Sequence, residues 1–294
     1  MIEQSTKVTF PGRAISGKSV VLACEDFQPN TTKTAIIVAE TPFHPVDHYW
    51  SDQPGDKGII KVNSNEYVVE QCLTAAVKQG SEQLFFDQDI PVKRDDPEWF
   101  YLVAHIIDKQ DVSRDLVGSE ATLEVDKNYR QALSKAHSIC HLASLALNKV
   151  AVPYWKKEFE RQDSLGNNDL DGVAIIESRV SAEGSVDRYR VGKSLRKKGF
   201  AAAEFFENLT EVANKIQQQL LSWSVEPIRI TVNPAASYLT DKREWSCVLP
   251  DGTAKIFCGG THLPEITQQD LGDIKILLHR ENDEPVFTMK ITKC

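Results

Sequence analysis

The sequence predicts an α+β protein of two domains. A small N-terminal β-barrel is expected over residues 1–125, followed by an α+β domain over residues 126–294. Short β-type runs separated by Gly, Pro or Asp fill the first region, and a helical run free of Gly and Pro begins at Lys127. The remainder mixes one further helix with several strands, so helices packed on a mostly antiparallel sheet are the economical arrangement.

The N-terminal region is predicted to be strands because its apolar residues recur with a period near two and many are β-branched. The runs, in chain order, are KVTF, SVVLA, TAIIVAE, GIIKVN, EYVVEQCL, EQLFFD, WFYLVAHIID and EATLEVD. Turn-forming residues separate them. A small barrel or sandwich is the architecture that such a series favours.

A long helix is predicted from Lys127 to Val150, with Asp126 as its N-cap. A second helix is expected over about residues 201–223, where Phe205, Leu209, Val212, Ile216 and Leu220 follow spacings of 4, 3, 4 and 4. The strand runs of this region are VAIIESRV, IRITV, EWSCVL, TAKIFC, IKILLH and VFTMKIT.

Composition limits the class of protein. With 294 residues, 41% of them apolar and 26% charged, the chain has ordinary globular usage. We expect a cytoplasmic protein, because no run approaches the roughly 18 apolar residues of a membrane span and the first residues do not resemble a signal peptide. The six cysteines are scattered without the spacing of a disulfide-bonded scaffold, so they are expected to be free thiols or metal ligands. A net charge of -8 disfavours binding of polyanions by the whole surface but allows a local basic patch.

Two histidine-containing motifs predict a metal site. In AHSICH, His137 and His141 are four residues apart and project from one face of the long helix. In FCGGTH, Cys258 and His262 flank two glycines that allow both side chains to turn inward. Three imidazoles and one thiolate form a tetrahedral zinc set. We therefore expect zinc to be bound by all four residues.

The sequence leaves the role of this zinc open. In the H-E-x-x-H pattern of metalloproteases a glutamate follows the first histidine, and here that position is Ser138, which disfavours protease chemistry. A closed set of four protein ligands is typical of structural zinc, whereas a ligand that leaves would make room for water or substrate. The ion could lower the pKa of a water molecule or hold the substrate in place.

HSICH on a helix, CGGTH about 120 residues later, and the following LPEITQQDLGDIKI together resemble the editing domain of alanyl-tRNA synthetase and its free-standing relatives, the AlaX trans-editing proteins. VGSEATLEVDKNYRQALSKAHSICHLASLAL and TPFHPVDHYWSDQPGDKGIIKV extend the resemblance upstream. It implies a barrel before a zinc-binding editing domain. It also implies a hydrolase that removes serine or glycine from the acceptor end of mischarged alanine tRNA, acting in trans.

Gln53, Ser138 and Thr261 are the candidate catalytic and substrate-binding residues, and the chain departs from the family near them. The family loop reads like E-S-G-G-Q before P-G-D, whereas here Ser51 and Asp52 replace the glycines, the loop is about three residues longer, and Gln53 remains. His44 replaces the usual tyrosine of T-P-F-Y. A site that hydrogen-bonds a serine hydroxyl discriminates well against alanine, and Ser138 and Thr261, each beside a proposed ligand, are candidate donors. Local backbone hydrogen bonding is the alternative role of both.

A basic segment, DRYRVGKSLRKKGF, predicts contacts with tRNA phosphates and terminal bases, with Tyr189 and Phe200 flanking it. The alternative is a solvated surface. GKS within the segment is no P-loop, because the required upstream glycine is Asp187. The cations expected to bind tRNA are Arg188, Arg190, Lys193, Arg196, Lys197 and Lys198.

The remaining candidates have mainly structural interpretations. His105 lies in an apolar strand and is expected to be a satisfied core histidine, and Cys140 is expected to pack in the core. Trp50 is either an aromatic that stacks on a base or a residue partly buried on the barrel. Two other functions stay open: a zinc hydrolase of a different small ester or amide, and a non-catalytic RNA-binding module with structural zinc.

Overall fold

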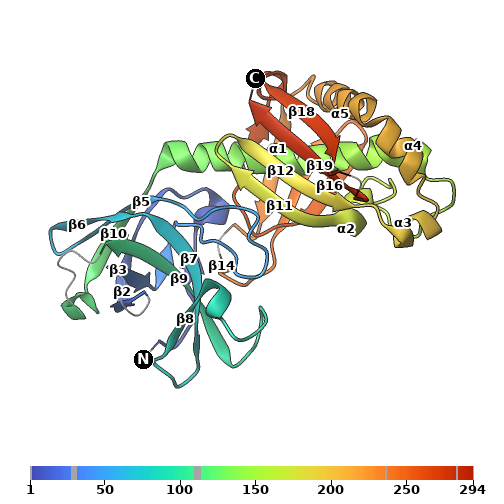
Figure 1. Cartoon of the computed structure of the whole chain (residues 1–294). Coiled ribbons are helices and arrows are strands. Elements are labelled where there is room, and N and C mark those ends of the chain that lie inside the picture. Colours follow the sequence, from blue (N-terminus) through green and yellow to red (C-terminus); the bar gives the residue numbers. More distant parts are fainter. Residues whose placement is uncertain (1, 28–31, 109–113, 236, 283, 294) are drawn as a thin grey trace. The chain divides into compact units, whose positions relative to one another are not determined.

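The protein, described here from a computed structural model, forms two compact units, whose elements are labelled in Figure 1. The structure describes residues 2–27, 32–108, 114–235, 237–282 and 284–293. Within those residues no helix is long and apolar enough to cross a membrane. Unit 1 comprises Met1–Gln131, Val232–Glu244 and Cys258–Thr261, and unit 2 comprises Ala132–Thr231, Trp245–Phe257 and His262–Cys294.

Unit 1 is built on an eight-stranded antiparallel sheet in the order β6-β5-β10-β2-β3-β9-β7-β8. Its strands are β2 (Ser16–Asp26), β3 (Lys33–Val38), β5 (Gly58–Val62), β6 (Asn65–Val69), β7 (Gln71–Lys78), β8 (Leu84–Phe86), β9 (Trp99–Asp108) and β10 (Glu120–Val125). Over the described residues β6 and β8 are its two edges, so the expected barrel is not closed. The run EYVVEQCL, predicted as one strand, is two, β6 and β7.

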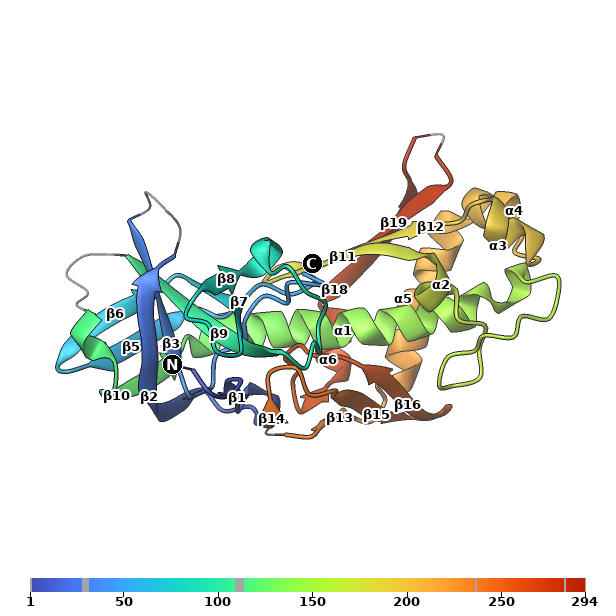
Figure 2. The ribbon, with the colours of Figure 1, turned by 90° about the horizontal axis from the view of Figure 1, so that it is seen from below.

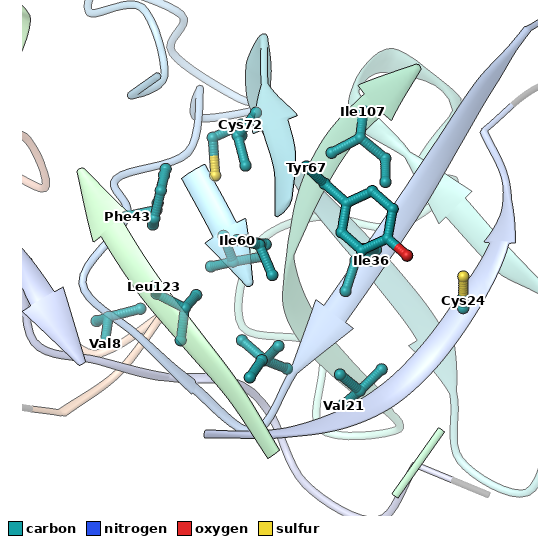
Figure 3. Packing of buried hydrophobic residues seen from close by; sticks show 14 of the residues in the cluster. Val8, Val21, Cys24, Ile36, Phe43, Ile60, Tyr67, Cys72, Ile107 and Leu123 are labelled. Atoms are coloured by element: carbon teal, nitrogen blue, oxygen red, sulfur yellow. The ribbon is translucent and has the colours of Figure 1, made fainter. Parts of the chain in front are cut away.

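The sheet of unit 1 is covered by apolar side chains on both faces. Ile36 and Val38 of β3 belong to the larger cluster, while Ala35 and Ile37, which point the other way along the same strand, belong to a second one. Figure 3 shows the larger cluster, to which many elements contribute. Burial on both faces explains why TAIIVAE is a continuous apolar run instead of an alternating one.

A small second sheet completes the strands of unit 1. Its order is β14-β1-β4, in which β1 (Lys7–Val8) pairs antiparallel with β14 (Ser237–Tyr238) and parallel with β4 (Glu40–Thr41). The β1–β14 pairing joins the N-terminal region to a segment more than 200 residues later in the chain. Unit 1 is therefore discontinuous in sequence.

Unit 2 contains two four-stranded sheets, in the orders β11-β12-β19-β18 and β16-β15-β13-β17. The first consists of β11 (Ile175–Ser181), β12 (Gly184–Arg190), β18 (Ile274–Arg280) and β19 (Val286–Lys293). The second consists of β13 (Ile228–Asn233), β15 (Glu244–Leu249), β16 (Gly252–Phe257) and β17 (Glu265–Ile266). The mixed α+β class with mostly antiparallel sheets is confirmed.

The long helix α1 (Lys127–Ala151) lies between the two sheets of unit 2, as Figure 2 shows. Its N-cap is the predicted one, because Asp126 Oδ1 accepts hydrogen bonds from the backbone amides of Asn128 and Tyr129 at 3.0 Å each. Successive side chains of α1 face opposite sheets. Cys140 Sγ lies 3.3 Å from Asp187 Oδ2 of β12, while the His141 ring lies 5.1 Å from the Trp245 ring of β15.

The other helices of unit 2 are shorter. They are α2 (Leu170–Ala174), α3 (Lys193–Lys197), α4 (Ala202–Glu207), α5 (Leu209–Trp223) and α6 (Gln268–Gly272). The helix predicted over about residues 201–223 is interrupted at Asn208, whose φ of -111° and ψ of 14° are not helical. Its apolar stripe nevertheless continues across the interruption, and α5 packs against β18 (Figure 1).

Candidate metal centre

The helix α1 presents two imidazoles from one face. His137 and His141 are one turn apart, and their ring centroids are 4.7 Å from each other. His262 approaches both, with its ring centroid 4.5 Å from that of His137 and 5.0 Å from that of His141. The buried indole of Trp245 lies against His141 on the sheet side. Three histidine rings therefore meet beside a buried indole.

The loop that follows β16 supplies the fourth candidate ligand. Cys258 is fixed through its backbone amide, which donates to the carbonyl of Arg243 at 3.0 Å, and its Sγ accepts a hydrogen bond from the amide of Gly260 at 3.4 Å. The ligand atoms of His137, His141, Cys258 and His262 all lie within 4.8 Å of one another. These four residues could hold a metal ion, as the motif spacing predicts.

The donor set fits a borderline-soft divalent ion such as zinc. Three imidazole nitrogens and one thiolate are a common zinc set. His141 Nε2 is buried and has no hydrogen-bond partner in the described part of the chain. Because an unsatisfied buried nitrogen costs free energy, this atom is suited to donate its lone pair to a metal. His137 and His262 are buried, and His141 and Cys258 are partly buried.

The protonation states of the ligands also fit metal binding. Burial lowers the pKa of His137 to about 4. Burial, and then the neighbouring His137, lower the pKa of His141 well below its ordinary value. Both rings are thus neutral near pH 7, which is the ligating form. Burial raises the pKa of the Cys258 thiol, and the charge of Asp52 acts in the same direction, so the metal-free thiol keeps its proton.

Ser138 orients His262. Its hydroxyl donates to the carbonyl of Ser134 at 2.7 Å, accepts from the backbone amide of Leu263 at 3.2 Å, and lies 3.3 Å from His262 Nδ1. Because the hydroxyl proton is already given to Ser134, the contact requires a proton on Nδ1, which leaves Nε2 of His262 as the ligating atom. Ser138 is fully buried. The structure therefore supports the local hydrogen-bonding role of Ser138 over a contact with substrate.

Gln53 holds Thr261 at two points. The Gln53 side-chain carbonyl accepts the backbone N–H of Thr261 at 2.9 Å, and its amide nitrogen donates to Thr261 Oγ1 at 2.9 Å. Gln53 and Thr261 are both buried, with 1% and 3% of their surface exposed. This clamp fixes the residue that lies between Gly260 and the ligand His262. The two candidate substrate-binding residues are thus in direct contact with each other.

A buried ion pair fixes the loop that carries Gln53. Arg130 donates from Nε to Asp56 Oδ1 at 2.8 Å and from Nη2 to Asp56 Oδ2, and its Nη2 also reaches the carbonyl of Pro42 at 2.7 Å. Asp56 and Arg130 are both buried. A bidentate arginine–carboxylate pair has a defined geometry, so it positions residues 42–56 relative to the start of α1. No local pattern of residues signals this pairing.

The other histidines have separate environments. His105 is fully buried, with Nδ1 2.9 Å from the carbonyl of Ile36 and Nε2 2.9 Å from Thr41 Oγ1, which confirms it as a satisfied core histidine. His44 is also buried, and its Nδ1 lies 3.5 Å from the Gln53 amide nitrogen. His279 is exposed. Cys140 is buried, as expected.

The basic segment forms the end of β12 and the helix α3. Arg188 is already paired, with Nε 2.7 Å from Glu281 Oε1 and Nη1 2.9 Å from Glu177 Oε2, so its charge is neutralised within the protein. Tyr189 and Phe200 are buried, so the prediction that they flank an RNA surface is wrong. The cations that remain exposed are Arg190, Lys193, Arg196, Lys197 and Lys198.

No ion pair involves these five exposed cations over the described residues, although Lys198 Nζ lies 5.3 Å from the centre of the Phe159 ring. Gly199, with a φ of +100°, turns the chain after α3 and brings the segment beside Lys157, since a Cβ on Gly199 would lie 2.8 Å from Lys157 Cβ. Lys157 is exposed as well. Sequence reasoning missed this residue because it is about 40 positions away.

Comparison with known proteins adds no assignment. No model of a protein family matches the chain, and no curated protein matches it. The function is therefore inferred from the geometry of the site and from the motif residues that form it.

Proposed function

We propose that the protein is a zinc-dependent hydrolase that removes a wrongly attached amino acid, serine or glycine, from alanine tRNA, acting in trans. The observation that carries the proposal is the cluster of His137, His141, Cys258 and His262, whose ligand atoms lie within 4.8 Å of one another. The helical HSICH and the CGGTH loop are the two motifs that resemble the alanyl-tRNA synthetase editing family. In this proposal, residues 126–294 form the editing domain.

The chemistry requires little from the protein beyond binding and orientation, because an aminoacyl-tRNA is an activated ester. When bound, zinc supplies a Lewis acid that polarises an ester carbonyl or lowers the pKa of a water molecule to about 7. The chain orients the ligands: Ser138 sets the tautomer of His262, and Gln53 fixes Thr261. Trp245, with no exposed surface, excludes water from one side of the imidazoles.

The RNA partner would be held by the exposed cations of α3 and the end of β12. Arg190, Lys193, Arg196 and Lys197 are exposed and make no ion pair in the described residues, so they are available to phosphates. Arg188 is removed from the expected set because Glu177 and Glu281 already bind it. A localised basic surface on a chain of net charge -8 favours a specific contact over general polyanion binding.

A deacylation assay tests this function. Zinc-loaded protein is incubated with alanine tRNA carrying serine, glycine or alanine, and ester cleavage is followed against metal-depleted protein. We expect cleavage of the serine or glycine ester, loss of cleavage on zinc removal, and recovery on zinc addition. His141→Ala is expected to lose activity together with metal, whereas the exposed His279→Ala is the matched control and retains both. Equal rates on the serine and alanine esters would contradict an editing function.

One observation favours a second candidate function, an RNA-binding module with structural zinc. The protein itself supplies four ligands to the site, and such closed sets are characteristic of structural zinc. This alternative predicts zinc-dependent folding and tight tRNA binding with no cleavage of any ester in the panel. Ester cleavage that depends on zinc while the metal-depleted protein stays folded would exclude it.

A further inference from the structure

The loop of residues 47–53 presents two adjacent aromatic side chains to solvent. Tyr49 is 72% exposed and Trp50 is 42% exposed. Their backbone is nevertheless fixed, because Asp47 Oδ1 accepts hydrogen bonds from the amides of Tyr49 at 2.8 Å and Trp50 at 3.1 Å, and the amide of Asp52 donates to the carbonyl of Trp50 at 2.9 Å. Two large aromatic side chains are thus displayed on a pre-organised backbone.

One end of this loop is bonded to the segment that carries Cys258, and the other end is paired with Arg94, which lies near that segment. At one end, Asp47 Oδ2 pairs with Arg94 Nη1 at 2.9 Å, and Arg94 Nη2 lies 3.8 Å from the position of a Cβ on Gly259. At the other end, Gln53 makes its two hydrogen bonds to Thr261. A group bound on the aromatic pair would therefore lie beside the segment of residues 258–261.

The charges around the loop limit what can bind there. Asp47 and Asp52 belong to the loop itself, and Gln88, which donates to the carbonyl of His48 at 3.4 Å, lies between Asp87 and Asp89. Arg94, which is paired with Asp47, offsets part of this negative charge. A stretch of several phosphates would be repelled. An uncharged planar ring can stack on Tyr49 or Trp50 without meeting that repulsion.

We propose that Tyr49 and Trp50 form a stacking platform for a single unpaired nucleobase at the 3' end of an RNA strand. This inference rests on the proposed function, in which the ester of that terminal nucleotide is presented to the loop of Cys258. Arg94 is a positioning residue, because its pair with Asp47 holds the loop that carries the platform. The phosphates of the RNA lie elsewhere, on cations such as those of α3.

The proposal is tested by RNA binding without any ester. The probes are an RNA hairpin with a single-stranded 3' end that terminates in adenosine, and the same hairpin with an abasic terminal ribose. Loss of stacking on one base corresponds to about 5- to 150-fold in affinity. We expect Trp50→Ala to weaken binding of the first probe by a factor in this range, while Trp50→Phe largely restores it. Tyr238→Ala, at another exposed aromatic residue, is the control and has no effect.

The abasic probe gives the deciding comparison. The parent protein and Trp50→Ala are expected to bind it equally, because it lacks the ring that stacks. The proposal is overturned if Trp50→Ala and Tyr49→Ala bind the adenosine-ended hairpin as tightly as the parent, or if the effect of Trp50→Ala is the same on both probes. Uncharged vesicles and an apolar peptide are also added as competitors. The proposal is overturned if either one binds the protein and removes the difference in affinity between the two hairpins.

Failure of this inference is distinguishable from failure of the proposed function. Base-dependent binding without ester cleavage supports the platform and contradicts the hydrolase. Zinc-dependent ester cleavage that Trp50→Ala leaves unchanged, together with unchanged binding, supports the hydrolase and contradicts the platform. Zinc content serves as the reference in every variant, because neither Tyr49 nor Trp50 is a candidate ligand.

Discussion

Zinc binding is expected to release one proton at pH 8, and the structure fixes this number. Burial lowers the pKa of His137 to about 4, so its ring is neutral at pH 8. The pKa of His141 is also far below its ordinary value. Even an imidazole with the ordinary pKa of about 6.5 is more than nine-tenths neutral at that pH. The Cys258 thiol, whose pKa burial raises, is the group that must lose a proton.

Isothermal titration calorimetry measures this release directly. Zinc is titrated into the metal-free protein in several buffers of different ionisation enthalpy, and the slope of the observed enthalpy against that quantity is the number of protons. We expect a slope near one for the parent and near zero for Cys258→Ala. Competition by one proton also makes the zinc affinity rise about tenfold per pH unit between about pH 7.5 and 8.5.

A slope near zero in the parent would refute the assignment of Cys258 as a thiolate ligand. A slope of two would show that a second group, either a zinc-bound water or another protonated ligand, also loses a proton at pH 8. His279→Ala is the control, since this exposed residue is not part of the site, and its slope is expected to equal that of the parent.

Three further results are expected. Ser138→Ala removes the partner of His262 Nδ1 and should weaken zinc binding by about 10- to 100-fold in a chelator competition; unchanged affinity would exclude the orienting role. Burial lowers the pKa of His105 to about 4, so below pH 6.5 this residue binds more protons in the unfolded state than in the folded state. Its contribution should lower the free energy of unfolding by about 3 kcal/mol from pH 6.5 to 4, measured by urea unfolding. His105→Gln should reduce this loss, and an unchanged pH profile would contradict the pKa. Replacing Arg196 and Lys197 with alanine should lower the slope of log K against log salt for tRNA by about 0.7 to 0.9 per lost phosphate contact, and an unaltered slope would make α3 a solvated surface.

The ligand set could be predicted from the sequence because each half of it is local. His137 and His141 are one helical turn apart, and Cys258 and His262 share one glycine-containing loop. The sequence does not predict which residues hold the two ligand pairs in place by hydrogen bonds. Ser138 and His262 are 124 residues apart, and Gln53 and Thr261 are 208 apart. Such pairings depend on the tertiary fold, so no periodicity or motif reveals them.

The strands of unit 1 were predictable, but their pairing was not. A period of two residues indicates that a segment is extended and says nothing of its neighbours, so the same runs suit a closed barrel and the open eight-stranded sheet that is found. The basic segment shows a related limit. Its charges suggested an RNA surface, yet Tyr189 points into the core from β12 and Arg188 is bound by two glutamates. Charge density in sequence does not reveal which charges are already neutralised.

X-ray absorption spectroscopy of the purified zinc-loaded protein shows whether His137, His141, Cys258 and His262 bind one zinc ion. We expect one zinc per chain with one sulfur at about 2.3 Å and three nitrogens at about 2.0–2.1 Å, and loss of the sulfur shell in Cys258→Ala. A zinc ion without sulfur in its first shell, or a parent protein that does not retain stoichiometric zinc, would contradict the account.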